Sequence, residues 1–127
     1  MKPIDGDRIR SAIRSAEEGT SGRIGVHVAQ GRVTDALDHA RAHFQRAGLH
    51  EYPDANAVLF VIAPKSRKFA VYGGEAIHTR LGDAFWNELV ADMAAYFADG
   101  RLTEGLTHGI DRVGKALRLH FPSMVNA

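Results

Sequence analysis

The clearest hydrophobic pattern of the chain lies between Asn56 and Ile77. Ala57 to Ala63 is apolar without interruption, and Pro64-Lys65-Ser66 ends the run. A shorter apolar run, Phe69 to Tyr72, follows and stops at Gly73-Gly74, where glycine can adopt positive φ. This pattern predicts a strand, a tight turn and a returning antiparallel strand. Because the first run has no polar alternation, we expect a central strand covered on both faces.

The N-terminal third predicts a helix, a strand and a second helix. Apolar residues recur at helical spacing between Asp5 and Glu18, which indicates one buried stripe. Ile24 to Ala29 alternates apolar side chains with Gly25 and His27 and is expected to be a strand. A second helix is predicted from Thr34 or Asp35 to about Ala47. Its expected inward residues are Leu37, Ala40, Phe44 and Ala47.

The chain after Gly73-Gly74 predicts helices only. A short helical segment is expected near Glu75 to Leu81, a long helix from Asp83 to about Ala98, and a last helix from Leu102 to about His120. The expected inward residues of the long helix are Trp86, Leu89, Val90, Met93 and Phe97.

The order of these elements is α-β-α-β-β-α-α. A right-handed crossover makes the first two strands parallel, and the hairpin makes the third antiparallel. We therefore expect an α/β sandwich of three layers, with a short mixed sheet and helices on both faces.

This topology brings three loops to one edge of the sheet. Thr20 and Ser21 precede the first strand, Asn56 precedes the second, and Gly73-Gly74-Glu75 follows the third, which runs the opposite way. His78 comes shortly after. Hydroxyls, an amide, a carboxylate and free backbone N–H groups could together hold an anion or a hydrated cation. Alternatively, these residues only satisfy turns and end a strand.

The opposite edge carries Lys65, Arg67 and Lys68 around the predicted hairpin turn. These cations could attract a phosphate group. Exposed hairpin tips are also commonly charged for solubility, and we favour that interpretation.

Three histidines lie on the predicted first strand and second helix. His39 and His43 are four residues apart and share a helix face, so they could bind one zinc ion. A third ligand is not apparent, and Ala40 stands where a metalloprotease helix has glutamate; no metal site is assigned. His27 is expected to be a packed histidine with one backbone partner.

Composition narrows the function classes. The length of 127 residues suits a single domain over 1–127. The absence of cysteine excludes disulfides, thiolate zinc sites and cysteine nucleophiles. A net charge of +1, with no block of like charge, argues against nucleic acid as a partner. There is no apolar signal core and no run of about 20 apolar residues, so we expect a cytoplasmic protein without membrane insertion.

Three motifs in order carry a resemblance to a known family: GTSGRIGVHV from Gly19, NAVLFVIAPKSRKFAVYGGEAI from Asn56, and YFADGRLTEGLTHGIDRVGKAL from Tyr96. They resemble the TPM domain, named for the TLP18.3, Psb32 and MOLO-1 proteins, and look closest to its short soluble bacterial branch. The resemblance runs from about Ile9 to Pro122. It implies a Rossmann-like α/β sandwich, a divalent-cation site and acid-phosphatase activity. Other relatives are accessory factors of membrane complexes.

The chain departs from the family pattern at the acidic positions. Ser66 and Gly74 stand where the family usually has aspartate, Ala76 replaces a usual glycine, and Arg23 stands where an acidic residue is common. Calcium and magnesium need several oxygen ligands. The departures therefore predict no tightly bound cofactor and at most weak Ca²⁺ or Mg²⁺ binding.

Three functions remain open. We favour a non-catalytic binding or accessory module for a protein complex, one associated with a membrane, and assign no catalytic residue. The first alternative is a divalent-cation-dependent phosphatase that uses Glu75, Asn56, Thr20 and a nearby histidine. The second is a domain that binds a small anion or nucleotide through its glycine loops.

Overall fold

The computed structural model describes residues 3–123 of the chain. Four α-helices, three strands and two short 3₁₀ turns follow one another in these residues. In chain order they are α1 (Gly6–Glu17), β1 (Arg23–Val28), α2 (Ala36–Arg46), η1 (Leu49–Glu51), β2 (Ala57–Ala63), η2 (Pro64–Ser66), β3 (Lys68–Gly73), α3 (Glu75–Ala98) and α4 (Leu102–His120). The predicted order of elements is confirmed.

The sheet is mixed and has the strand order β1-β2-β3. β1 and β2 are parallel, with Ile24 opposite Val58, and β2 and β3 are antiparallel, with Val58 opposite Gly73. All seven residues of β2 are buried. The uninterrupted apolar run therefore forms the central strand, as predicted.

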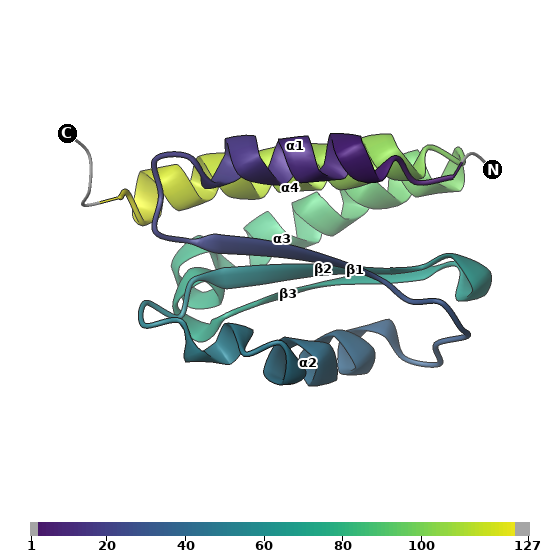
Figure 1. Ribbon diagram of the computed structural model, residues 1–127, viewed down its shortest axis with the longest axis horizontal. Helices are drawn as coiled ribbons and strands as arrows, with labels where there is room; N and C mark the ends of the chain where they lie inside the picture. The colour runs from purple at the N-terminus through teal and green to yellow at the C-terminus, as the bar shows by residue number, and fades with distance from the viewer. Residues whose placement is uncertain (1–2, 124–127) are drawn as a thin grey trace.

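Helices cover both faces of this sheet. Figure 1 shows α2 on one face, and α1 and α4 side by side with α3 on the other. β2 contributes side chains to a hydrophobic core on each face of the sheet, because successive side chains of a strand point to opposite faces. Val58, Phe60 and Ile62 join the core under α1, α3 and α4, whereas Leu59 and Val61 join the core over α2. The predicted α/β sandwich is confirmed.

Acidic side chains start the first two helices. Asp5 caps α1 by accepting hydrogen bonds from the backbone N–H of Asp7 and Arg8, and Asp35 caps α2 through the N–H of Asp38. The expected break before Asp83 is a kink in α3, where Gly82 adopts φ 78° and ψ 163°.

Three residues expected inward face solvent instead. Leu37 is 48% exposed and Val90 is 39% exposed, and Ala47 is also exposed. The buried apolar faces of α2 and α3 are therefore narrower than the sequence predicted. α2 meets the sheet through Ala36, Ala40 and Phe44, and α3 faces its core through Trp86, Leu89 and Met93. Leu37 and Val90 each follow a buried residue, about 100° further around the helix.

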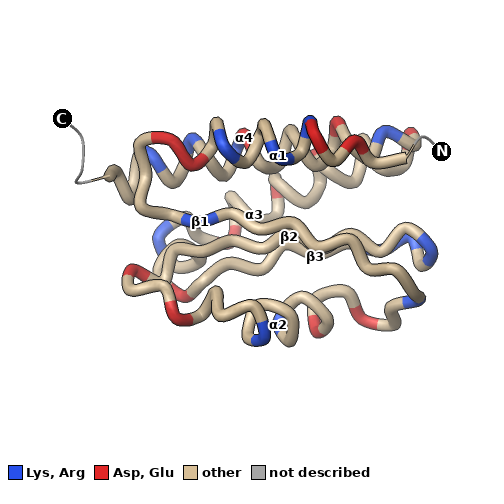
Figure 2. Tube along the Cα trace, viewed as in Figure 1, with Lys and Arg blue, Asp and Glu red and all other residues tan. Residues whose placement is uncertain are grey.

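Charge divides the two edges of the sheet. In Figure 2, acidic residues lie near the edge where β2 begins, and lysine and arginine gather at the β2–β3 turn on the opposite edge. Between residues 3 and 123, no helix is both long and apolar enough to cross a bilayer.

Candidate functional site

The seven residues predicted for a site lie at one edge of the sheet. The register pairs Arg23 with Ala57 and Val58 with Gly73, so the starts of β1 and β2 meet the end of β3. The residues nevertheless divide into two groups. Thr20, Ser21 and Asn56 form hydrogen bonds within the fold, whereas Gly73, Gly74, Glu75 and His78 border a surface hollow.

Thr20 fastens the C-terminal end of α4 to the start of β1. Its hydroxyl oxygen lies 2.5 Å from the carbonyl oxygen of Phe121 and 3.2 Å from that of Leu117, and it accepts a hydrogen bond of 3.0 Å from the Gly22 N–H. Thr20 is only 9% exposed. Both its donor and its acceptor capacity are used inside the fold, so the hydroxyl is not directed at a ligand.

Asn56 belongs to a short chain of polar side chains. Its amide nitrogen donates to Ser21 Oγ at 3.0 Å, and this hydroxyl donates to an Asp54 carboxylate oxygen at 3.2 Å. Asn56 is 1% exposed, while Ser21 and Asp54 are exposed. The buried amide thus positions a hydroxyl and a carboxylate that remain open to solvent.

The backbone of Ala55 accepts hydrogen bonds from the first turn of α3. Its carbonyl oxygen accepts hydrogen bonds from the N–H groups of Ala76 at 3.1 Å and Ile77 at 3.3 Å, and the Gly74 N–H donates to the Ala57 carbonyl. Ala55 itself is held at φ 50°, an uncommon conformation for a residue with a side chain. Three N–H groups that could have bound an anion are therefore already satisfied.

Gly74 is the position where the family resemblance implies an aspartate. A Cβ atom there would lie 2.6 Å from the Ala55 carbonyl oxygen and 2.8 Å from its carbon. Any side chain would thus require the loop before β2 to move. The backbone arrangement that places the Ala55 carbonyl beside residue 74 leaves no room for a side chain there. An aspartate at this position would not fit it.

Glu75 and His78 line a surface hollow of about 590 Å³ between α2 and the β3–α3 turn. The His78 ring stacks on Trp86, with centroids 5.8 Å apart, and its Nε2 lies 3.9 Å from the Asp83 carboxylate. Apolar and aromatic side chains, among them Leu37, Phe44, Leu49 and Tyr72, also line the hollow. Its chemistry is mixed, with an apolar wall beside one carboxylate, that of Glu75, and two imidazoles, those of His50 and His78.

Sequence reasoning missed three polar residues near this edge, Asp54, Glu17 and Tyr52, and named Arg23 only as a departure from the family pattern. Asp54 lies two residues before Asn56, and the rule that placed Asn56 at the edge also places Asp54 there. Glu17 accepts a hydrogen bond of 2.8 Å from the Ile24 N–H. Arg23 donates to the Tyr52 hydroxyl at 2.7 Å, and this bond is the main cause that raises the pKa of Arg23. No sequence pattern indicated the contact between Arg23 and Tyr52.

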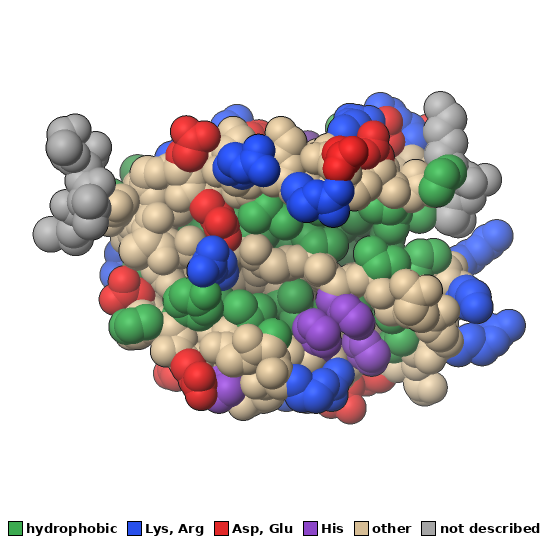
Figure 3. Space-filling view, viewed as in Figure 1, with side chains coloured by type: hydrophobic (Ala, Val, Ile, Leu, Met, Phe, Trp, Pro, Cys, Tyr) green, Lys and Arg blue, Asp and Glu red, His purple; other side chains and the backbone are tan. Residues whose placement is uncertain are grey.

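The three histidines of β1 and α2 form one surface patch, visible in Figure 3. The His27 ring stacks on His43 with centroids 3.9 Å apart and on His39 at 5.4 Å. His27 thus contacts imidazoles, not the single backbone partner expected from the sequence. The rings are nearly parallel. Within residues 3–123, no three His, Cys, Asp or Glu side chains are arranged to hold a metal ion.

Burial and neighbouring cations lower the pKa of two of these imidazoles, those of His27 and His43. Desolvation is the main cause that lowers the pKa of His27, followed by the charges of His43, His39 and Arg46. Desolvation also lowers the pKa of His43, followed by Arg46 and His39. The Nε2 atom of His39 is buried without a hydrogen-bond partner among the described residues.

Comparison with known proteins assigns the chain to a family. A family model described as the TPM domain matches residues 2–116. The chain belongs to the TPM domain family. The resemblance seen in the three sequence motifs is therefore confirmed. No match was found among curated proteins.

Solved structures similar to this TPM domain include those of three proteins. The BA42 protein of the psychrophile Bizionia argentinensis has 31% sequence identity and a TM-score of 0.84, over 95% of this chain and 86% of BA42. The N-terminal domain of a P. gingivalis protein has 16% identity and a TM-score of 0.72, over 97% of this chain and 83% of that one. The N-terminal domain of the cg2496 protein of Corynebacterium glutamicum has 16% identity and a TM-score of 0.66, over 95% and 73%. The last two show likeness of fold alone.

Proposed function

We propose that this TPM domain is a non-catalytic binding module, which docks a partner protein in the hollow beside the β3–α3 turn. In this proposal the protein is cytoplasmic and the partner belongs to a membrane-associated complex. The observation that carries the proposal is that polar side chains predicted to bind a ligand form hydrogen bonds with other groups of the protein instead. The Thr20 hydroxyl and the Asn56 amide make hydrogen bonds within the fold, so they stabilise loops and do not face a substrate.

The lining of the hollow supports a protein partner. Leu37 is 48% exposed on its rim, and a large exposed apolar side chain next to aromatic ones is typical of protein interfaces. The Phe44 and Tyr72 rings meet edge to face at 4.9 Å and give the apolar wall a fixed shape. Glu75 and His78 supply polar groups at the rim.

The competing proposal is a divalent-cation-dependent phosphatase. Asp54 favours it, because its carboxylate lies beside the Ser21 hydroxyl at the predicted edge. Asp54 and Glu75 would provide two carboxylates where the sequence alone suggested one. Hard cations prefer a larger set of oxygen ligands, so we rank this function second.

One pair of experiments separates the two functions. Membrane extracts would be photo-cross-linked to the purified chain, and the captured protein compared between Leu37→Asp and Leu119→Asp. Leu119 is the matched control, since it is 75% exposed on α4 and distant in sequence from the hollow. We expect one defined partner with wild type and Leu119→Asp, and its loss with Leu37→Asp.

Hydrolysis of p-nitrophenyl phosphate would be measured in parallel with calcium, magnesium or a chelator. We expect no turnover under any of these conditions. Turnover that disappears on chelation and in Asp54→Asn, together with identical cross-linking by the two leucine variants, would reverse the ranking.

A further inference from the structure

A second cavity lies at the opposite edge of the sheet, between the β2–β3 turn and the junction of α3 with α4. Its volume is about 430 Å³, which falls within the range of small-molecule sites. Most of its lining is apolar and includes Ile62, Phe69, Phe97 and Leu102. The Phe69 and Phe97 rings meet edge to face with centroids 4.7 Å apart, so this wall is well packed.

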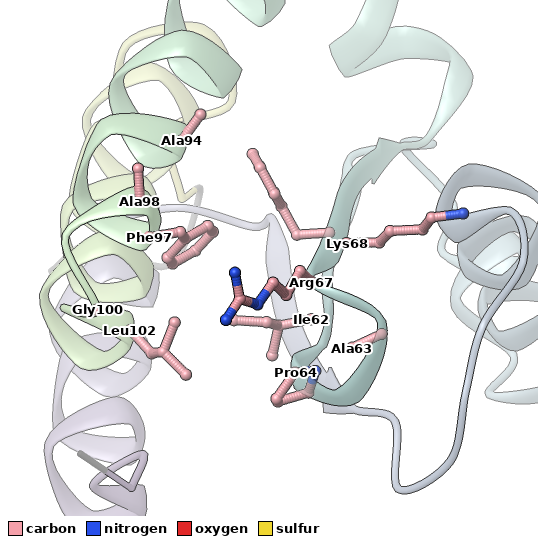
Figure 4. Close-up of a pocket in the computed structure, with 11 residues that line it drawn as sticks. Ile62, Ala63, Pro64, Arg67, Lys68, Ala94, Phe97, Ala98, Gly100 and Leu102 are labelled. Carbon is pink, nitrogen blue, oxygen red and sulfur yellow. The ribbon is translucent and has the colours of Figure 1, made fainter. Parts of the chain in front are cut away.

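Arg67 is an exposed residue of the turn, and it brings a cation to the lining of this apolar cavity. Its side chain points from the turn toward Phe97 and Leu102 in Figure 4. The backbone of Arg67 has the left-handed conformation, with φ 53° and ψ 46°. With this backbone the side chain points toward the cavity. The lining includes no acidic residue. Within the part of the chain that the structure describes, the Arg67 guanidinium has no hydrogen-bond or ion-pair partner.

The two other cations of the turn do not share this role. The Lys68 ammonium extends away from the cavity in Figure 4 and donates to the Thr34 carbonyl. Lys65 is exposed and does not line the cavity. Lys68 is among the residues that line the cavity, but of the three cations only Arg67 directs its charged group toward it.

The start of α4 also lies at this cavity. Leu102 is the first residue of α4 and lines the cavity. The positive end of the helix dipole is already offset by Glu104, whose carboxylate lies in the first turn and bonds to its own backbone N–H. The attraction for an anion therefore comes from the Arg67 guanidinium, which stands beside apolar walls without a partner among the described residues.

We propose that this cavity binds a small amphipathic carboxylate, such as a fatty acid of medium chain length. The apolar chain packs between Phe97, Leu102 and Ile62, and the carboxylate pairs with the Arg67 guanidinium. A carboxylate matches the planar fork of guanidinium donors and forms two parallel hydrogen bonds with it. An apolar ligand without a charge would leave the guanidinium unpaired, so the site distinguishes a carboxylate from an alcohol of the same length.

The test is a titration of the full chain with sodium decanoate, and separately with decanol, followed by amide NMR. We expect decanoate to shift the signals of Ala94, Ala98 and Gly100, which line the cavity. Arg67→Gln should raise the dissociation constant about tenfold or more, since a charge-assisted hydrogen bond is lost. Lys65→Gln is the matched control on the same turn and should change it less than about twofold.

Ala94→Trp provides a second variant that blocks the cavity without touching its charge. Ala94 is exposed at the cavity rim, so the substitution should leave the core intact. We expect it to abolish the decanoate shifts while the rest of the spectrum is retained. The proposal is overturned if decanoate shifts none of these signals, if decanol binds as tightly as decanoate, or if Arg67→Gln and Lys65→Gln weaken binding equally.

Discussion

At residue scale, position 74 joins the start of α3 to the loop before β2. The Ala55 carbonyl oxygen lies 2.6 Å from the position that a Cβ atom of residue 74 would take, and it accepts the first hydrogen bonds of the helix. Gly74 has φ −60°, so the requirement for glycine is one of space. The Ala55 carbonyl leaves no space for the aspartate that the family resemblance implies at position 74. It also takes up the N–H groups of Ala76 and Ile77, which an anion site would need free.

We predict that Gly74→Ala lowers the free energy of unfolding by about 1–3 kcal/mol, as overpacking does. The added methyl group would displace the Ala55 backbone or lengthen its bonds to Ala76 and Ile77. The measurement is urea denaturation followed by circular dichroism. Gly31→Ala is the matched control, because no atom lies within 4 Å of a Cβ there, and it should change the free energy by less than about 0.5 kcal/mol. Equal stability of the two variants would contradict the steric argument.

The residue scale also shows where sequence reasoning about the site succeeds and where it stops. The alternation of strands and loops correctly placed Thr20, Asn56 and Gly74 at one edge. It could not show that the Thr20 hydroxyl bonds to the Phe121 carbonyl, because that contact joins residues 101 positions apart. Side-chain hydrogen bonds of this kind depend on how the chain after α4 meets the loop between α1 and β1, which hydrophobic periodicity does not specify.

At the scale of elements, β1 and α2 meet through the patch formed by His27, His39 and His43. Helical spacing predicted that His39 and His43 share a face, but not that this face meets His27. The crossover places α2 over the sheet, yet its rotation about its own axis is set by Ala40 and Phe44 in the core. That rotation also explains why Leu37 is exposed.

We predict that this patch makes stability fall with mild acid. The lowered pKa values of His27 and His43 mean that the unfolded chain binds protons more readily than the native state. Stability is therefore complete above the ordinary histidine pKa of 6.5 and is lost as the pH falls from there toward the lower native values. Arg46 is the charged neighbour that adds to both shifts.

The measurement is the melting temperature between pH 7.5 and pH 5.5 (a range above the usual carboxylate values). His27→Gln should make the melting temperature fall less on acidification, because the variant lacks one imidazole whose pKa is lowered in the native state. His50→Gln is the control, since His50 lies beside Glu51 and outside the patch, and it should retain the wild-type slope. An unchanged melting temperature across the range would show that the patch is not proton-linked.

At the scale of the whole molecule, β2 connects two cores that otherwise lie on opposite faces of the sheet. Leu59 contributes to the core over α2, and Phe60 contributes to the core under α1, α3 and α4. Every residue of β2 is buried, so neither core can lose its strand without exposing the other. The sequence predicted this arrangement because an apolar run without alternation can only be covered on both faces.

We therefore predict that the molecule unfolds in one step, even when only one core is damaged. Leu59→Ala removes buried atoms from the α2 side and should cost about 2–5 kcal/mol. Trp86, the single tryptophan, belongs to the opposite core, so its fluorescence reports on a region that this mutation does not touch. Urea midpoints from Trp86 fluorescence and from far-UV circular dichroism should fall by the same amount. Leu106→Ala, in the core of Trp86, is the matched variant and should also shift both midpoints together. If Leu59→Ala lowered the circular dichroism midpoint while the Trp86 transition stayed in place, the α2 layer would unfold on its own, and β2 would not couple the two cores.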